Sequence, residues 1–119
     1  MRGVRDKSTR EVGNILEDYV VELIRKVDKD ARRTKNSGAS LEVSDIYNKY
    51  FYVECKNSPS KTDLPVKREV WYKLIAKMPN KDKVPLYVIA NKHNDRFVVM
   101  DLDEFFREFV YKLYEHEGE

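Results

Sequence analysis

The sequence predicts an α/β fold in which helices flank a mixed central β-sheet. Apolar residues recur at helical spacing near the start of the chain and again near its end. Between these regions lie short runs rich in β-branched and aromatic residues, separated by turn-forming residues. Together the patterns give the element order αβββαββα. A chain of 119 residues, 41% of them hydrophobic, is expected to form one domain over residues 1–119.

A first helix is predicted over about residues 9–27 from helical spacing of apolar residues. Ser8 and Glu11 have the spacing of a capping box at its start. Glu17 lies at the flank of the apolar stripe. Its carboxylate could reach into a metal site or remain an ordinary surface group, and the pattern leaves both readings open.

A first strand is predicted over residues 31–35, and the loop 36–40 follows it. Ser37 and Gly38 give this loop a hydroxyl group and an accessible backbone. Such a loop suits contact with a phosphate, although a simple turn has the same composition. Three basic residues lie beside it: Arg32, Arg33 and Lys35.

Residues 44–56 are predicted to form a β-hairpin whose loop is Asn48-Lys49. This loop would pair Asp45 with Tyr52. Because side chains alternate along a strand, the hairpin has a polar and an apolar face. The polar face carries Asp45, Tyr52, Glu54 and Lys56, and the apolar face carries Ile46, Phe51, Val53 and Cys55.

The two carboxylates of this hairpin are the strongest functional signal. As diagonal neighbours, Asp45 and Glu54 would lie roughly 7–8 Å apart, within reach of a shared divalent cation. An ordinary solvated sheet face carrying the same charges is the alternative.

The second half of the chain predicts a helix, a strand pair and a last helix. The helix covers residues 65–78, with Pro65 near its first position, and carries Lys67 and Lys73. Strands follow at 86–90 and 97–100. The last helix is capped by Asp101 or Asp103 and bears many aromatic residues, among them Phe105, Phe106, Phe109, Tyr111 and Tyr114.

The composition indicates the cellular compartment and the kinds of partner to expect. A single cysteine, Cys55, excludes an internal disulfide and fits a reducing, cytoplasmic compartment. Because side chains alternate along the predicted strand, the Cys55 thiol is expected on its apolar face and in the core. The chain has no apolar run that could span a membrane, so no membrane association is expected. The net charge is only +2, yet residues 2–10 and 25–35 are basic and could hold a polyanion. The alternative is that these basic segments are ordinary solvated ends and turns of the chain.

With these residues in place, the chain resembles the PD-(D/E)XK nuclease superfamily, and within it the archaeal-type Holliday junction resolvases and their viral relatives. The resemblance covers roughly residues 12–99. It rests on Glu17, Arg33, the Ser37-Gly38 loop, Asp45 and Glu54-Cys55-Lys56. Ser44 stands where the superfamily's name has proline. The resemblance implies a restriction-endonuclease-like core and an intracellular protein, with a viral origin left open.

The resemblance also implies roles for these residues in Mg²⁺-dependent hydrolysis of DNA, with Mn²⁺ expected to substitute. Asp45 and Glu54 would bind the metal, the Cys55 carbonyl would be a further ligand, and Glu17 would complete the outer shell. Lys56 would orient or deprotonate the attacking water, or stabilise developing negative charge. Ser37 would contact the DNA near the scissile phosphate, and Lys67 or Lys73 would contact its backbone.

Branched DNA, in particular a four-way junction, is the expected substrate. One chain carries one set of catalytic residues, so paired cuts in a junction imply a homodimer. Two alternatives remain open from the sequence. One is a restriction-like or nicking endonuclease on linear DNA, and the other is a non-catalytic nucleic-acid-binding module on the same fold.

Overall fold

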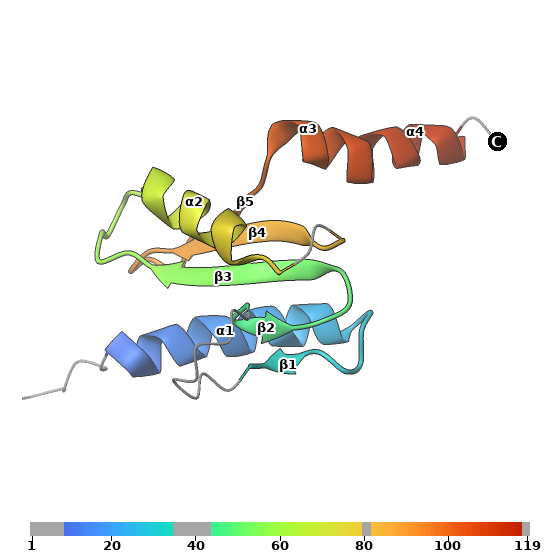
Figure 1. The fold of residues 1–119 in the computed structure, drawn as a ribbon. Coiled ribbons are helices and arrows are strands. Elements are labelled where there is room, and N and C mark those ends of the chain that lie inside the picture. Colours follow the sequence, from blue (N-terminus) through green and yellow to red (C-terminus); the bar gives the residue numbers. More distant parts are fainter. Residues whose placement is uncertain (1–8, 35–43, 80–81, 118–119) are drawn as a thin grey trace, which may run out of the picture.

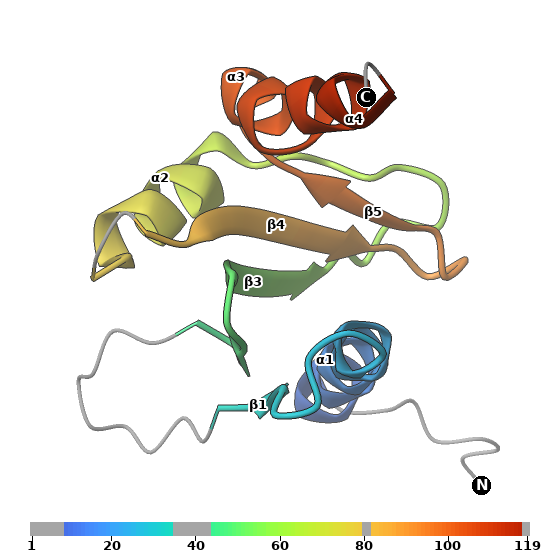
Figure 2. The ribbon, with the colours of Figure 1, turned by 90° about the vertical axis from the view of Figure 1, so that its right-hand side faces the viewer.

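A three-stranded mixed sheet forms the middle layer of the fold, and helices cover both of its faces (Figure 1, Figure 2). β3 (Phe51–Asn57) runs parallel to β4 (Val84–Ala90), and β5 (Arg96–Val99) pairs antiparallel with β4. The computed structural model describes residues 9–34, 44–79 and 82–117, and for residues 9–14 only the backbone. The predicted α/β class with a mixed sheet flanked by helices is confirmed.

Helix α1 (Thr9–Arg25) covers one face of the sheet. Its Leu16 and Val21 are buried in a core cluster that also holds Ile46, Val53, Cys55, Val88 and Ala90. The predicted helix was two residues too long at its C-terminal end. Val27 lies beyond the helix and is 89% exposed.

Helix α2 (Arg68–Lys77) covers the opposite face. Its Leu74 is buried against Tyr52, Tyr87 and Ile89. The predicted start at Pro65 was wrong, because Lys67 is extended and serves as the N-cap. The backbone N–H of Lys67 donates to the Tyr87 hydroxyl at 3.5 Å, which holds this residue against the sheet instead of in a first helical turn.

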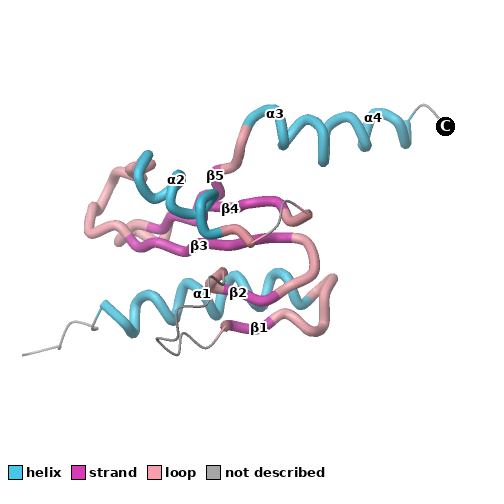
Figure 3. Tube along the Cα trace, viewed as in Figure 1, coloured by secondary structure: helices cyan, strands magenta, loops and turns pink. Residues whose placement is uncertain are grey.

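The prediction of one central sheet was also wrong. β1 (Arg32–Arg33) and β2 (Ile46–Tyr47) form a separate antiparallel pair, with Arg32 opposite Tyr47 and Arg33 opposite Ile46. The pair lies next to α1 and β3 (Figure 3). The predicted hairpin required β2 to pair with β3. In the described residues β2 instead forms its ladder with β1.

A buried asparagine side chain makes the chain reversal between β2 and β3. Asn48 is 2% exposed. Its Nδ2 donates to the carbonyl oxygens of Ile46 and Phe51, at 3.1 and 3.0 Å. Its Oδ1 accepts from the backbone N–H groups of Tyr50 and Phe51, at 3.1 and 2.8 Å. One side chain thus hydrogen-bonds four backbone groups of the reversal, one of which, the Ile46 carbonyl, also accepts from the Ser44 hydroxyl at 2.7 Å.

This turn shifts the register by one residue from the predicted one. The backbone N–H of Asp45 donates to the carbonyl of Val53 at 2.8 Å, so Asp45 lies opposite Val53 and not Tyr52. In a regular ladder, a one-residue shift would move Asp45 to the face away from Glu54. Asp45 lies outside both ladders, however, and its carbonyl accepts from Thr34 on the other side at 3.0 Å.

The C-terminal region differs from the single predicted helix, so the element order also differs there. Helix α3 (Leu102–Phe105) is followed by the π-helical segment η1 (Phe106–Val110) and by helix α4 (Tyr111–Glu117). Asp101 caps α3, because its carboxylate accepts from the Glu104 N–H at 3.0 Å. The segment lies on the side of the sheet opposite α1 (Figure 1, Figure 2).

Replacing Asn48 with alanine should destabilise the protein by about 3 kcal/mol, because buried backbone groups lose their partners. Urea unfolding followed by circular dichroism would measure the difference. Lys49→Ala is the matched control in the same turn, since its ammonium lies exposed over the Tyr50 ring and should contribute under about 1 kcal/mol. Equal stability of the two variants would contradict the role assigned to Asn48.

Candidate active site

Asp45 is held at the edge of β3 by its own side chain. Its Oδ2 accepts the backbone N–H of Cys55 at 2.7 Å. In a strand the N–H and C=O of one residue point to the same side. The Cys55 carbonyl, predicted as a metal ligand, therefore lies on the edge that faces Asp45.

Glu54 meets Asp45 at this edge although the predicted register was wrong. The pKa of Glu54 is raised to about 7, first by burial, then by the charge of Asp45 and by a side-chain hydrogen bond with Asp45. The ammonium groups of Lys56 and Lys77 act in the opposite direction. The Glu54 carboxyl group is therefore partly protonated near neutral pH.

Glu17 joins the same group from the other side of β3. The pKa of Glu17 is raised to about 7, first by burial and then by the charge of Asp45; Arg33 acts to lower the pKa and Asp18 to raise it. Arg33 itself donates to Asp18 at 2.8 Å. Because Asp45 lies at the strand edge, it interacts both with Glu17 on the α1 face and with Glu54 on the α2 face.

Cys55 lies in the core, as predicted from its parity. Burial raises the pKa of its thiol strongly, and the charges of Asp45, Glu17 and Glu54 act in the same direction. The thiol therefore stays protonated at neutral pH and is not suited to act as a nucleophile.

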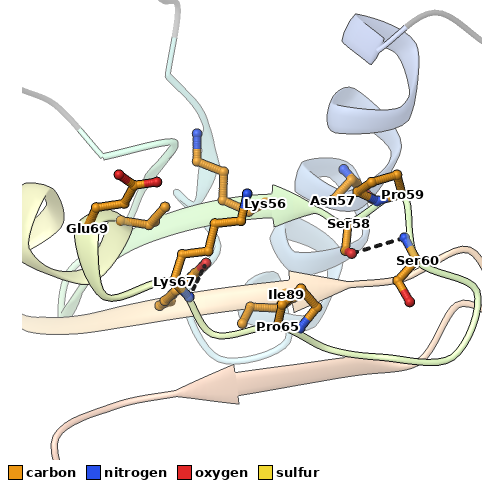
Figure 4. A pocket seen from close by; sticks show the side chains of 11 residues that line it. Lys56, Asn57, Ser58, Pro59, Ser60, Pro65, Lys67, Glu69 and Ile89 are labelled. Carbon is orange, nitrogen blue, oxygen red and sulfur yellow. Dashed lines mark hydrogen bonds between the residues drawn. The ribbon is translucent and has the colours of Figure 1, made fainter.

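Lys56 follows at the exposed end of β3, where its side chain lies at a pocket beside α2 (Figure 4). Its ammonium acts on the Glu54 carboxylate. Lys56, Glu54 and Asp45 thus belong to one electrostatic group, as the sequence predicted. Lys77 is a member that the sequence analysis missed, although its spacing of three from buried Leu74 places it on the same side of the helix.

Carboxylate and carbonyl oxygens are the donors that Mg²⁺ prefers, so the chemistry of this group fits such a cation. The cations near Glu17 and Glu54 do not outweigh burial and the charge of Asp45, so both carboxyl groups keep raised pKa values, and a divalent cation would add positive charge there. Within residues 9–34, 44–79 and 82–117, no three Asp, Glu, His or Cys side chains are arranged closely enough to hold a metal ion. A cation would therefore have to draw the carboxylates together.

The predicted DNA-contacting residues fall into separate places. Arg32 lies over the Tyr47 ring, with its guanidinium carbon 4.2 Å from the ring centre, and Arg33 pairs with Asp18. Lys67 lies at the start of α2 and lines the same pocket as Lys56. Lys73 is exposed on α2. Lys35, Ser37 and Gly38 lie outside the described residues.

Comparison of the chain with protein-family models, with curated proteins and with solved structures finds no match. In the part of the chain that the structure describes, no helix combines the length and apolar character needed to cross a bilayer.

Without divalent cations, raising the pH should destabilise the protein. The ordinary pKa of 4.5 rises to about 7 in the fold for Glu17 and Glu54, so the folded state binds more protons than the unfolded state between these values. The free energy of unfolding therefore falls as pH rises through this window. Glu54→Gln should remove part of the slope and add about 1 kcal/mol of stability at pH 8, after allowing for solvent screening.

Urea unfolding in EDTA at pH 5 and pH 8 would measure this effect. Glu22→Gln is the matched control on α1, because Glu22 is exposed and contacts only the exposed Arg25 among the described residues. If the free energy of unfolding depends on pH as steeply in Glu54→Gln as in Glu22→Gln, the raised pKa of Glu54 is contradicted.

Proposed function

We propose that this protein is a metal-dependent DNA endonuclease that hydrolyses phosphodiester bonds. The observation that carries the proposal is the meeting of the Asp45 and Glu54 carboxyl groups at the edge of β3. This arrangement costs stability, because burial and the like charge of Asp45 oppose the ionisation of Glu54. Such a cost is typical of functional sites.

Asp45, Glu54, the Cys55 carbonyl and Glu17 are the groups that would hold Mg²⁺ or Mn²⁺. When bound, the cation would neutralise charge on the phosphate and lower the pKa of a coordinated water. The Cys55 N–H fixes one oxygen of Asp45 at 2.7 Å, and the Glu54 side chain, which hydrogen-bonds Asp45, lies beside the same carboxylate. Glu17, on the opposite side of β3, suits a place in the outer shell.

Lys56 would orient the attacking water or stabilise negative charge on the phosphate. It lies two residues beyond Glu54 on the same face of β3, and its ammonium already acts on the Glu54 carboxylate. Because the lysine is exposed, a substrate can reach it without a change in the core.

A restriction-endonuclease-like core is the finer fold assignment that we propose. The order α1, β1, β2, β3, α2, β4 supports it, as does the placement of the acidic residues on β3 and at the entry to it. The separate β1–β2 pair is a departure from one continuous sheet.

Branched DNA is the substrate class that we propose. Glu17 supports this choice, because a helix carboxylate coupled to the strand carboxylates is the feature that links the chain to junction resolvases. Arg32, exposed on β1 over the Tyr47 ring, adds a cation that a DNA backbone could contact. Cleavage of four-way junction, flap, single-stranded and linear duplex DNA would separate this substrate from the linear DNA of a nicking enzyme.

A homodimer would supply the two sites that paired cuts require. The C-terminal segment offers apolar surface for it, since Tyr111 and Tyr114 are 59% and 69% exposed and Leu113 lies exposed between them. Phe109 is already used inside the chain, where its ring stacks on Phe51 with centroids 6.4 Å apart. An apolar surface of this kind is typical of an interface between copies.

DNA cleavage should require Mg²⁺ or Mn²⁺ and fall at least about a hundredfold in Asp45→Asn, Glu54→Gln and Lys56→Ala. Ca²⁺ should support DNA binding with little turnover, because its looser coordination positions water poorly. Asp30→Asn is the control, since this exposed carboxylate lies apart from the group around Asp45. If folded Asp45→Asn protein cleaved DNA at the wild-type rate, the proposed active site would be wrong.

The double variant Tyr111→Glu, Tyr114→Glu should be monomeric under conditions in which the wild type is a dimer, because it places two charges in the apolar surface. Light scattering at micromolar concentration measures the mass, and junction mapping shows whether cuts stay paired. Lys112→Glu changes the net charge by the same amount at a neighbouring exposed site and should remain dimeric. A monomeric wild type that makes unpaired nicks would favour the nicking enzyme instead.

A further inference from the structure

A pocket of about 570 Å³ lies beside Lys56, between the end of β3 and the start of α2 (Figure 4). This volume falls in the range of sites for small molecules, roughly 300–1,000 Å³. The lining residues are Lys56, Asn57, Ser58, Pro59, Ser60, Pro65, Lys67, Glu69, Val70, Tyr87 and Ile89. Apart from Lys56 and Lys67, the site described above uses none of them.

The charges around the pocket suit a singly charged anion. Lys56 and Lys67 contribute two ammonium groups and Glu69 one carboxylate, which leaves one net positive charge. Figure 4 shows the two lysine side chains rising on the same side of the sheet. A phosphodiester carries one negative charge, so it matches this balance better than a di- or triphosphate does.

The loop that forms one end of the pocket is held rigidly and presents hydroxyl groups. Ser58 Oγ accepts the Ser60 N–H at 3.1 Å, and Ser60 Oγ accepts the N–H groups of Thr62 and Asp63 at 3.2 and 2.8 Å. In these bonds the hydroxyl oxygens accept, so each hydroxyl hydrogen is left to donate to a ligand.

Backbone bonds fix the same loop to the end of β4. The Ser58 N–H donates to the Ala90 carbonyl at 2.7 Å, and the Lys92 N–H donates to the Ser60 carbonyl at 2.9 Å. A pocket wall that is already fixed loses little entropy when it binds a ligand.

The remaining wall is apolar and contains one polar atom. Pro65, Val70 and Ile89 contribute hydrocarbon surface. Tyr87 is 2% exposed, and its hydroxyl oxygen accepts the Lys67 N–H, so its hydrogen too is left to donate. Flat apolar surface with a few directed hydrogen-bond donors is what a nucleobase needs.

We propose that this pocket binds one nucleotide of a DNA strand, turned out of the base stack, next to the bond that is cut. Its phosphodiester lies between Lys56 and Lys67, and its base lies against the wall of Pro65, Val70 and Ile89. The placement beside the scissile bond rests on the proposed nuclease function, because Lys56 belongs to both sites. Unpaired nucleotides at branch points enter such a pocket at the lowest unstacking cost.

Titration of the full chain with the dinucleotide TpT, followed by ¹H–¹⁵N NMR, tests the pocket without requiring cleavage. Saturable shifts are expected at the amides of Ser58, Ser60 and Lys67. Lys67→Ala should weaken TpT binding roughly tenfold, as expected for loss of one charge-assisted contact. Lys61→Ala, which removes an exposed charge from the same loop without touching the pocket, should bind within about twofold of wild type.

Three outcomes would overturn the proposal: no shifts at these amides, equal loss in both lysine variants, or inorganic phosphate binding as tightly as TpT. Shifts with thymidine 5′-monophosphate but not with TpT would identify a site for free nucleotides and would also overturn it. A wild type that binds TpT here but cuts no DNA with Mg²⁺ would end the nuclease proposal and the placement beside a scissile bond, and would leave the nucleotide pocket standing. A wild type that cuts DNA but shows no shifts with TpT would end the pocket proposal alone.

Discussion

The buried amide of Asn48 is the constraint on which the candidate site depends. In the described part of the chain β2 pairs with β1, so no ladder fixes β2 against β3. The four bonds of Asn48 set where the chain reverses and therefore where Asp45 arrives beside β3. A second buried asparagine, Asn91, works in the same way after β4, where its Oδ1 accepts the N–H groups of His93 and Asp95. Each asparagine hydrogen-bonds backbone N–H groups of a chain reversal with its side-chain oxygen.

The separation of β2 from β3 places the Asp45 carboxylate where it acts on both Glu17 and Glu54. A residue inside a regular sheet faces one side of it, whereas Asp45, at the strand edge, interacts with groups on both. Glu17 and Glu54 lie on opposite sides of β3, and both owe part of their raised pKa to Asp45. The arrangement weakens the fold at neutral pH, because burial and the charge of Asp45 oppose the ionisation of Glu17 and Glu54. Carboxyl groups kept at the edge of the core in this way lower the stability of the fold, and a bound cation would offset their repulsion.

Strand β3 organises both proposed sites because its two faces are used differently. The face with Val53 and Cys55 is closed by α1 and supplies the core. On the other face Tyr52 is covered by α2, while Glu54 is partly buried and Lys56 is exposed. Burial thus decreases along the strand toward its C-terminal end, where the pocket opens. The helix α2 begins only at Arg68, and this late start leaves the space beside Lys56 and Ser58 uncovered.

The sequence by itself determined the α/β class, α1, the β4–β5 pair and the alternation of β3, because these depend on local periodicity and turn chemistry. It also singled out Asp45, Glu54, Lys56 and Glu17, and in the structure Asp45 acts on the charges of both Glu17 and Glu54 while Lys56 acts on that of Glu54. Only the tertiary structure decided the register of Asp45, the splitting of the sheet and the start of α2. Those depend on contacts between distant residues, such as Asp45 with Cys55 and Lys67 with Tyr87, which no local pattern encodes. The pocket could not be predicted from the sequence for the same reason. Its walls come from β3, β4 and α2, which meet only when the strands pair.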